Sequence, residues 1–173
     1  MKKYIFIFYL FFFSYFSILN ADITINFIDV DKALSLSKPG KALLKQLDEI
    51  NKKIKSNIMK EEAIIKKKEK KIIAQKNIIS TEEFQSEISK LKNEIDKHNS
   101  NKRKKFSDFE KIKINNMNNF LKKMNDILIK YSEENEISII LKKRDLVIGK
   151  TALDITDEII KIINEQVKEF KVK

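Results

Sequence analysis

The sequence predicts a mainly α-helical fold in which a long antiparallel helical hairpin, a coiled-coil arm, projects from a small β-rich oligomerisation domain. No Pro or Gly occurs from Lys41 to Tyr131, and this stretch is far longer than the roughly 11–12 residues of an average helix. Apolar residues recur through it with helical spacing, as they do in paired helices. Short β-branched apolar runs near both ends of the chain predict a small sheet built from those ends.

Residues 1–21 have the order of a secretory signal peptide. Two lysines precede nine consecutive apolar residues, Ile5 to Phe13, and the small residue Ala21 ends the segment. The alternative is an uncleaved membrane anchor, although Tyr4 to Leu19 is 16 residues long, just short of the roughly 17–25 that span a bilayer. The chain contains no Cys, which excludes a lipid-modified cysteine and disulfides.

The mature chain is expected to begin with a largely buried strand, in which Ile23, Ile25 and Phe27 share one side. A short helix over residues 31–36 should follow. Residues 37–40 hold the only Pro/Gly cluster and predict a turn. The first long helix starts there.

The outward helix carries a seam that is apolar at every second contact position. Ile58, Ile65, Ile72 and Ile79 recur every seven residues. A seam of this kind is weaker than one with both positions apolar, so the outer arm is expected to be less rigid than its base. The alternate, polar positions fall at Glu61 or Glu62, Lys68 or Glu69, and Gln75 or Lys76.

The hairpin tip is expected near residues 77–81. Ser80 can accept a hydrogen bond from the backbone N–H of Glu83, and Glu83 can reach back to Ser80, which is the capping box that starts a helix. The returning helix continues the apolar seam, and His98 falls on its line. We expect His98 to be a tolerated polar layer rather than a pH sensor.

Beyond the arm, residues 137–141 and 146–148 are two apolar runs with β-branched residues. Residues 142–145 join them, so the sequence predicts a β-hairpin. Asp154 should then cap a last helix, whose buried side chains are expected to be Ile159, Ile160, Ile163 and Val167.

The body comprises residues 22–40 and 132–173, and the arm comprises residues 41–131. Such a small body is marginally stable alone, and its strand edges need covering. Both arguments predict an oligomer whose subunits complete one another's sheets. The side chains expected at the oligomer contacts are Ile23, Ile25, Phe27, Ile137, Ile139, Leu141, Leu146 and Ile148.

Positive charge is concentrated on the arm. The chain has a net charge of +11, and residues 52–111 alone hold 18 basic and 10 acidic residues. Such a field favours acidic partners, although an A+T-biased genome would also enrich lysine. A nucleic-acid binder would fit the pI of about 9.6, but Gly-rich loops and interleaved aromatics are missing and a signal peptide removes the chain from most nucleic acid. We therefore expect no nucleic-acid partner.

The sequence favours neither an enzyme nor a metal or cofactor site. One His and no Cys give no basis for a zinc site. No Gly-rich phosphate loop or nucleophile elbow occurs. We expect no catalytic residues and no cofactor.

Several short motifs follow one another in a fixed order. They are Val30-Asp31, Gly40-Lys41-Ala42, Ser80 with the acidic residues after it, Glu136–Leu141, and Asp154-Ile155-Thr156-Asp157. Their order and spacing resemble those of the Skp/OmpH family of periplasmic chaperones over the whole mature chain. The resemblance implies a homotrimer whose bodies join and whose arms enclose a cavity. It also implies that unfolded outer-membrane β-barrel proteins are held there, in the periplasm, without ATP.

The resemblance and the arm charge together nominate residues that contact these unfolded clients. A solvated helix face is the competing interpretation of the lysines, and burial in the seam is that of the aromatic residue. Lipopolysaccharide or an anionic membrane surface is a further partner that the resemblance raises, but the family's basic positions for lipopolysaccharide do not align cleanly here. A membrane-anchored or periplasmic coiled-coil scaffold is the alternative function. The nominated residues are Lys66, Lys67, Lys70, Lys71, Phe84, Lys102, Arg103, Lys104 and Lys105.

Overall fold

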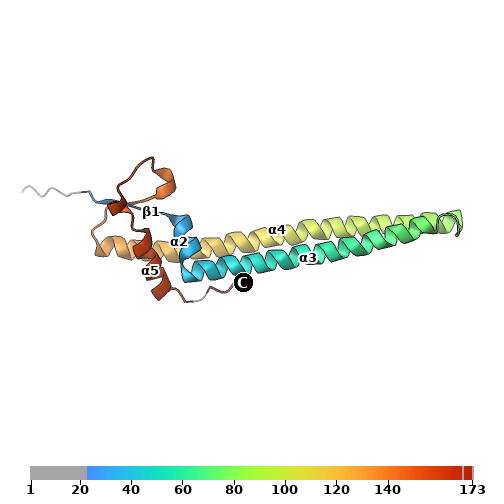
Figure 1. The fold of residues 1–173 in the computed structure, drawn as a ribbon, viewed down its shortest axis with the longest axis horizontal. Coiled ribbons are helices and arrows are strands. Elements are labelled where there is room, and N and C mark those ends of the chain that lie inside the picture. Colours follow the sequence, from blue (N-terminus) through green and yellow to red (C-terminus); the bar gives the residue numbers. More distant parts are fainter. Residues whose placement is uncertain (1–22, 169, 173) are drawn as a thin grey trace, which may run out of the picture.

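The computed structural model describes residues 23–168 and 170–172, so the expected signal peptide lies outside the described residues. Figure 1 shows a small body at one end and two long helices, α3 and α4, that run from it side by side to a distant tip. In chain order the elements are β1 (Ile25–Ile28), α2 (Val30–Leu36), α3 (Lys38–Ala74), α4 (Thr81–Glu134), β2 (Ile139–Lys142) and α5 (Thr156–Gln166), with short 3-10 turns at Lys143–Asp145 and Thr151–Leu153.

The two arm helices differ in length. Helix α3 has 37 residues and α4 has 54, which correspond to about 55 Å and about 80 Å at 1.5 Å per residue. Helix α4 therefore continues past the start of α3 and supports the body (Figure 1). At the tip the chain turns over residues 75–80. The Ser80 hydroxyl accepts from the Glu83 N–H at 3.2 Å, as the cap in the sequence predicts.

A close backbone approach sets the corner between α2 and α3. Ser37 caps α3 by accepting from the Gly40 N–H at 3.2 Å. Pro39 and Gly40 therefore lie inside the first helical turn instead of forming a separate turn, since proline is tolerated there. A Cβ on Gly40 would lie 1.8 Å from the Leu34 carbonyl oxygen, so only glycine permits this corner.

The sheet of the body joins the two ends of the chain. Strands β1 and β2 pair in parallel, with Ile25 opposite Ile139, and the whole arm is the crossover that parallel pairing requires. The sheet that the structure describes has two strands, so the expected β-hairpin over residues 137–148 is wrong. After β2 the chain enters a 3-10 turn, and Lys143 pairs with Asp154 at 3.0 Å, which directs residues 146–148 away from β2.

The core lies where the sheet, α2 and α5 pack on the base of the arm. The end of the chain closes it, because the Gln46 side chain donates to the Phe170 carbonyl at 2.6 Å and accepts from the Val172 N–H at 3.1 Å. The Phe170 ring packs on Phe120, with 6.1 Å between centroids. The buried cluster consists of Ile28, Ala33, Leu34, Leu43, Leu47, Phe109, Phe120, Met124, Ile127, Ile155, Ile159, Ile163 and Phe170.

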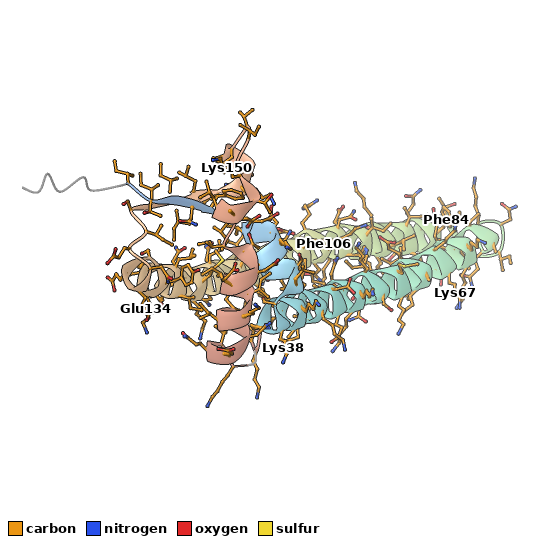
Figure 2. The ribbon with its side chains drawn as sticks, turned by 60° about the vertical axis from the view of Figure 1, so that its left-hand side comes forward. Lys38, Lys67, Phe84, Phe106, Glu134 and Lys150 are labelled. Carbon is orange, nitrogen blue, oxygen red and sulfur yellow. The ribbon has the colours of Figure 1, made fainter. Side chains whose placement is uncertain are left out.

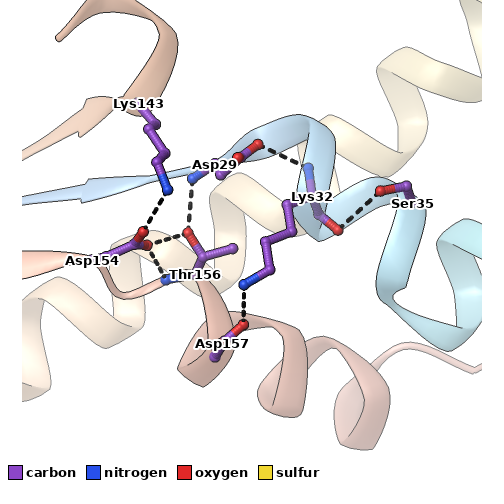
Figure 3. A network of polar contacts seen from close by, with 7 residues as sticks. All are labelled: Asp29, Lys32, Ser35, Lys143, Asp154, Thr156 and Asp157. Atoms are coloured by element: carbon purple, nitrogen blue, oxygen red, sulfur yellow. Dashed lines mark hydrogen bonds and ion pairs between the residues drawn. The ribbon is translucent and has the colours of Figure 1, made fainter. Parts of the chain in front are cut away.

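A polar network connects the start of α5 to α2 (Figure 3). Asp154 accepts from the Thr156 N–H at 3.0 Å, although the N-cap position of α5 is taken by Ile155, which makes no side-chain cap bond. The Thr156 hydroxyl accepts from the Asp29 N–H at 2.9 Å. Lys32 pairs with Asp157 at 2.7 Å. Partial burial raises the pKa of Asp154, but hydrogen bonds from Thr156 and Lys143 outweigh it and hold that pKa below its ordinary value.

Candidate functional site

The outer part of α3 presents lysines and isolated apolar side chains on the same exposed face. Lys66 and Lys70 lie on a line of 4-3-4-3 spacing that begins at Met59, passes Ala63 and ends at Ile73. Met59 and Ile73 are both exposed, and Figure 2 shows side chains projecting all along this part of the arm. The arm surface is therefore mixed in character, with single apolar contacts among cations.

Lys67 and Lys71 lie on a second line beside the first. Ile64 precedes them at a spacing of three, and it is also exposed. All four lysines were predicted from the sequence as contact residues, whereas the exposed apolar residues beside them were not. The same 3-4 spacing, followed outside the seam, would have revealed them.

The seam between α3 and α4 is buried only at intervals in the outer arm. Ile58 and Ile72 of α3 and Leu91 of α4 are buried there, whereas Ile65 is half-buried. Phe84, near the tip in Figure 2, is also half-buried. Its ring therefore belongs partly to the seam and partly to the surface.

A polar layer interrupts the seam in the middle of the arm. The His98 side chain is 8% exposed, its Nδ1 lies 3.1 Å from a Glu61 oxygen, and its Nε2 lies 3.7 Å from a Glu62 oxygen. The Nε2 atom is buried without a hydrogen-bond partner among the described residues. His98 is thus a polar seam residue flanked by two carboxylates from the opposite helix.

The four consecutive basic residues of α4, residues 102–105, differ in their contacts with this polar layer. Lys105 lies 2.7 Å from Glu61, and Lys102 lies 2.8 Å from Glu62, so both lysines are paired across the seam. Arg103 and Lys104 are exposed. Only half of this run is therefore presented to solvent as free cationic surface.

The ion pairs favour the ionised form of both carboxylates. The hydrogen bond from Lys105 lowers the pKa of Glu61, and the hydrogen bond from Lys102 lowers the pKa of Glu62. His98 adds a smaller lowering to each. The layer therefore joins α3 to α4 by charge where the seam lacks apolar side chains.

The outer face of the two-stranded sheet is apolar and uncovered. Ile25 and Ile139 are paired in register and therefore share this face, and both are more than two-fifths exposed. Ile23, Leu141 and Ile148 are also exposed. Eight apolar residues were expected at oligomer contacts, and all of them except Phe27 are at least partly accessible in one subunit. Ile137 and Leu146 are half-buried.

Phe27 is the exception, and its assignment to an oligomer contact is corrected. It is 6% exposed because the loop after β2 covers its ring. The Lys143 ammonium lies 5.8 Å from the ring centroid, and a Cβ on Gly149 would lie 2.7 Å from the ring edge. Phe27 therefore belongs to the core of its own subunit.

Residues 24–163 match the family described as outer membrane protein (OmpH-like). The chain belongs to the OmpH-like family. The motif resemblance described above is therefore confirmed. A solved OmpH-like structure from Caulobacter crescentus CB15, described as a candidate outer membrane chaperone, aligns with 86% of this chain and 88% of its own, with a TM-score of 0.79 and 15% identity. This structural similarity confirms the expected fold class. A comparison with curated protein sequences found no match to the chain.

Two features are absent from the part of this OmpH-like chain that the structure describes. No group of three His, Cys, Asp or Glu residues there is placed to hold a metal ion. No described helix is both long and apolar enough to cross a membrane.

A groove lies between α4 and β2 of the OmpH-like body. Its volume is about 640 Å³. Apolar side chains from three elements line it, so it appears only when the chain is folded and could not be read from the sequence. They include Leu34, Met117, Leu121, Leu128 and Ile140.

Proposed function

We propose that this OmpH-like protein is an ATP-independent holdase chaperone of the periplasm, which keeps unfolded outer-membrane β-barrel proteins from aggregating. The observation that carries the proposal is the mixed arm surface, on which lysines alternate with isolated exposed apolar residues. Family membership and the similarity to a candidate outer membrane chaperone support it. The proposed activity is binding alone, without catalysis.

The chemistry of this surface suits such clients. Strands of β-barrel proteins alternate apolar and polar side chains and lack long apolar segments, so isolated contacts can match them. Unpaired strand edges aggregate by pairing with one another. Many weak contacts along an arm separate such edges without holding any one segment tightly. The same lysines would also favour lipopolysaccharide or an anionic membrane surface.

Aggregation of an unfolded client tests the proposal directly. A urea-unfolded outer-membrane β-barrel protein is diluted into buffer with the mature chain and no nucleotide, and light scattering is followed. We expect the chain to suppress scattering. Serine at Met59, Ile64 and Ile73 should weaken this suppression several-fold, because these side chains supply the exposed apolar contacts of the outer arm.

A matched control places serine at three exposed apolar residues outside the outer arm, Leu36, Leu44 and Ile114. This variant should suppress scattering as well as the wild type does. Undiminished scattering with a folded wild-type chain would rule out the holdase. Equal loss in both variants would rule out the outer arm as the binding surface.

We further propose that the protein acts as a homotrimer joined through its bodies. The uncovered apolar face around Ile25 and Ile139 supports self-association, and three arms would together enclose a client. Sedimentation of the mature chain, alone and with an unfolded client, measures the mass. A monomer at micromolar concentration would contradict the enclosed cavity.

A further inference from the structure

A short strap follows α5 and runs back toward α3 (Figure 1). It consists of residues 167–168 and 170–172 of the described chain, and none of them is in a helix or strand. Phe170 is buried, Lys171 is exposed and Val172 is half-buried. The side chains over these three positions therefore alternate between the protein and the solvent, as they do along a strand.

One side chain of α3 holds the backbone of the strap. The Gln46 amide nitrogen donates to the Phe170 carbonyl at 2.6 Å, and the amide oxygen accepts from the Val172 N–H at 3.1 Å. The same nitrogen donates to the Ala42 carbonyl at 3.1 Å, which fixes the direction of the amide. A residue of a parallel strand binds its neighbour in the same way, through one carbonyl and the N–H two positions further on. Gln46 is therefore suited to an extended backbone with any side chains.

The ring of Phe170 occupies the apolar part of the same site. It packs on Phe120 of α4 with 6.1 Å between the ring centroids and an angle of 53° between the rings, and tilted pairs of this kind are favourable. The Lys123 ammonium lies 5.9 Å from the centroid of the Phe170 ring, which is within cation–π range. Gln46, Phe120 and Lys123 together form what we call the strap site.

The strap is not an ideal occupant of the strap site. It carries the cations Lys168 and Lys171 to a site that already holds the Lys123 ammonium, and like charges disfavour one another. Phe170 is the one fully buried side chain among its described residues. Segments with so little buried surface open locally at low cost, so a better-matched segment can replace the strap.

We propose that the strap site binds extended segments of unfolded clients and that the strap competes with them for it. The fitting segment carries an aromatic residue and, two positions further on, an aliphatic one, with an acidic or neutral residue between them. Strands of outer-membrane β-barrels alternate apolar and polar residues in this way. The inference rests on the proposed holdase function and adds a second site at the base of the arm, where backbone hydrogen bonds contribute to binding.

Fluorescence anisotropy of a labelled peptide tests the site. The probe is Ser-Thr-Thr-Phe-Asp-Val-Ser, and the control peptide Ser-Thr-Thr-Asp-Phe-Val-Ser has the same composition with the two apolar residues adjacent. We expect the full chain with Phe170→Ser to bind the probe about tenfold more tightly than the wild type does, because apparent affinity falls with the fraction of time a site is free. The control peptide should bind this variant several-fold more weakly than the probe.

Two further variants separate an opened site from a loosened core, with circular dichroism to show that each is folded. Phe109→Ser removes another buried ring of the same cluster but leaves the strap intact, so it should not tighten probe binding. Gln46→Ala added to Phe170→Ser should weaken probe binding about tenfold, because the peptide backbone loses two hydrogen bonds. If Gln46 only fastens the strap, this second substitution would leave probe binding unchanged, and the proposal would be wrong.

Hydrogen exchange on the wild-type chain gives a measurement that needs no substitution. Saturating probe should speed exchange of the Val172 amide, measured by NMR, because displacement of the strap breaks the hydrogen bond of this N–H to Gln46. Bound probe with unchanged Val172 exchange would place the peptide elsewhere and overturn the proposal. A folded Phe170→Ser chain that suppresses client aggregation but binds no probe would also overturn it and leave the holdase function intact. A wild-type chain that does not suppress aggregation would instead refute the holdase function itself.

Discussion

Gly40 shows how one absent side chain sets the direction of the arm. Helix α3 leaves the body at a corner where the Gly40 Cα faces the Leu34 carbonyl, and an added Cβ would lie 1.8 Å from that oxygen and 2.7 Å from the Ser37 hydroxyl. The nearest atom belongs to the backbone, so it cannot rotate away. The corner must open if any side chain is introduced.

Gly40→Ala should therefore destabilise the body. We expect a loss of about 1–3 kcal/mol, the usual cost of overpacking a close contact, measured by urea unfolding followed by circular dichroism. Lys41→Ala, at the next and exposed position, serves as the control and should change stability little. Equal stability of both variants would show that the corner does not depend on glycine.

Local chemistry was predictable at single residues, and contacts between distant residues were not. The Ser80 cap followed from the sequence because a cap involves a few neighbouring residues, whereas the expected Asp154 cap is displaced by one residue, since Ile155 takes the N-cap position of α5. The inward turn of Lys102 and Lys105 depends instead on the register of two helices, since Lys105 and Glu61 lie 44 positions apart. Sequence spacing alone could not distinguish these lysines from Arg103.

At the scale of the arm, the His98 layer makes helix pairing depend on pH. Because Glu61 and Glu62 have pKa values below the ordinary 4.5, their pairing contributes stability above that value. The contribution is lost as pH falls through the lowered pKa values. The groups that face one another are His98, Lys102 and Lys105 of α4 and the two glutamates of α3.

Thermal unfolding monitored from pH 7 to pH 3 should accordingly show weaker helix pairing at the acidic end. Glutamine at both Glu61 and Glu62 removes this contribution, so the variant should lose less stability than the wild type on acidification. A control with glutamine at Glu133 and Glu134, both exposed at the end of α4, should behave as the wild type does. Identical pH profiles for all three chains would contradict the role of the layer.

Hydrogen exchange should separate the outer arm from its base. Ile58, Ile72 and Leu91 are isolated buried positions in the outer seam, whereas Phe120 and Met124 of α4 lie in the continuous core. Amides between about residues 58 and 100 should therefore exchange faster than those of the α4 base. Equal protection along α4 would show that the polar seam does not weaken the arm.

The whole molecule concentrates its positive charge on the arm, while the body holds basic and acidic residues in similar numbers. Residues 52–111 carry 18 basic and 10 acidic residues, which gives a proposed trimer a strongly positive set of arms. Such a field speeds the encounter with acidic clients and is screened over about 8 Å at physiological ionic strength.

Client association should therefore slow as salt rises, while dissociation should change less. Glutamine at Lys66, Lys67, Lys70 and Lys71 should lower the association rate at low salt and flatten its salt dependence, as stopped-flow fluorescence can measure. An association rate insensitive to both salt and these substitutions would leave the apolar contacts as the whole basis of holding. The matched control carries glutamine at four exposed lysines near the body: Lys41, Lys45, Lys130 and Lys161.

The order of elements was predictable for the whole molecule, but the sheet pairing was not. Unbroken helical periodicity over residues 41–131 is a strong signal, which is why the arm was recognised. Residues 146–148 have the composition of a strand, but composition does not show whether a partner strand is available within one subunit. The pairing of β1 with β2 involves residues on either side of the arm, and no local pattern encodes it.

This parallel pairing also orders events during synthesis. Ile25 lies 114 positions before its partner Ile139, so at about 5–20 residues per second β1 waits on the order of ten seconds for β2. The arm helices involve nearer neighbours and can form first, which brings the two strands together before they pair. A chain that terminates before Ile139 would have arm helices without a sheet. Translation errors of this kind would be excluded from assembly, since only a full-length chain builds the body.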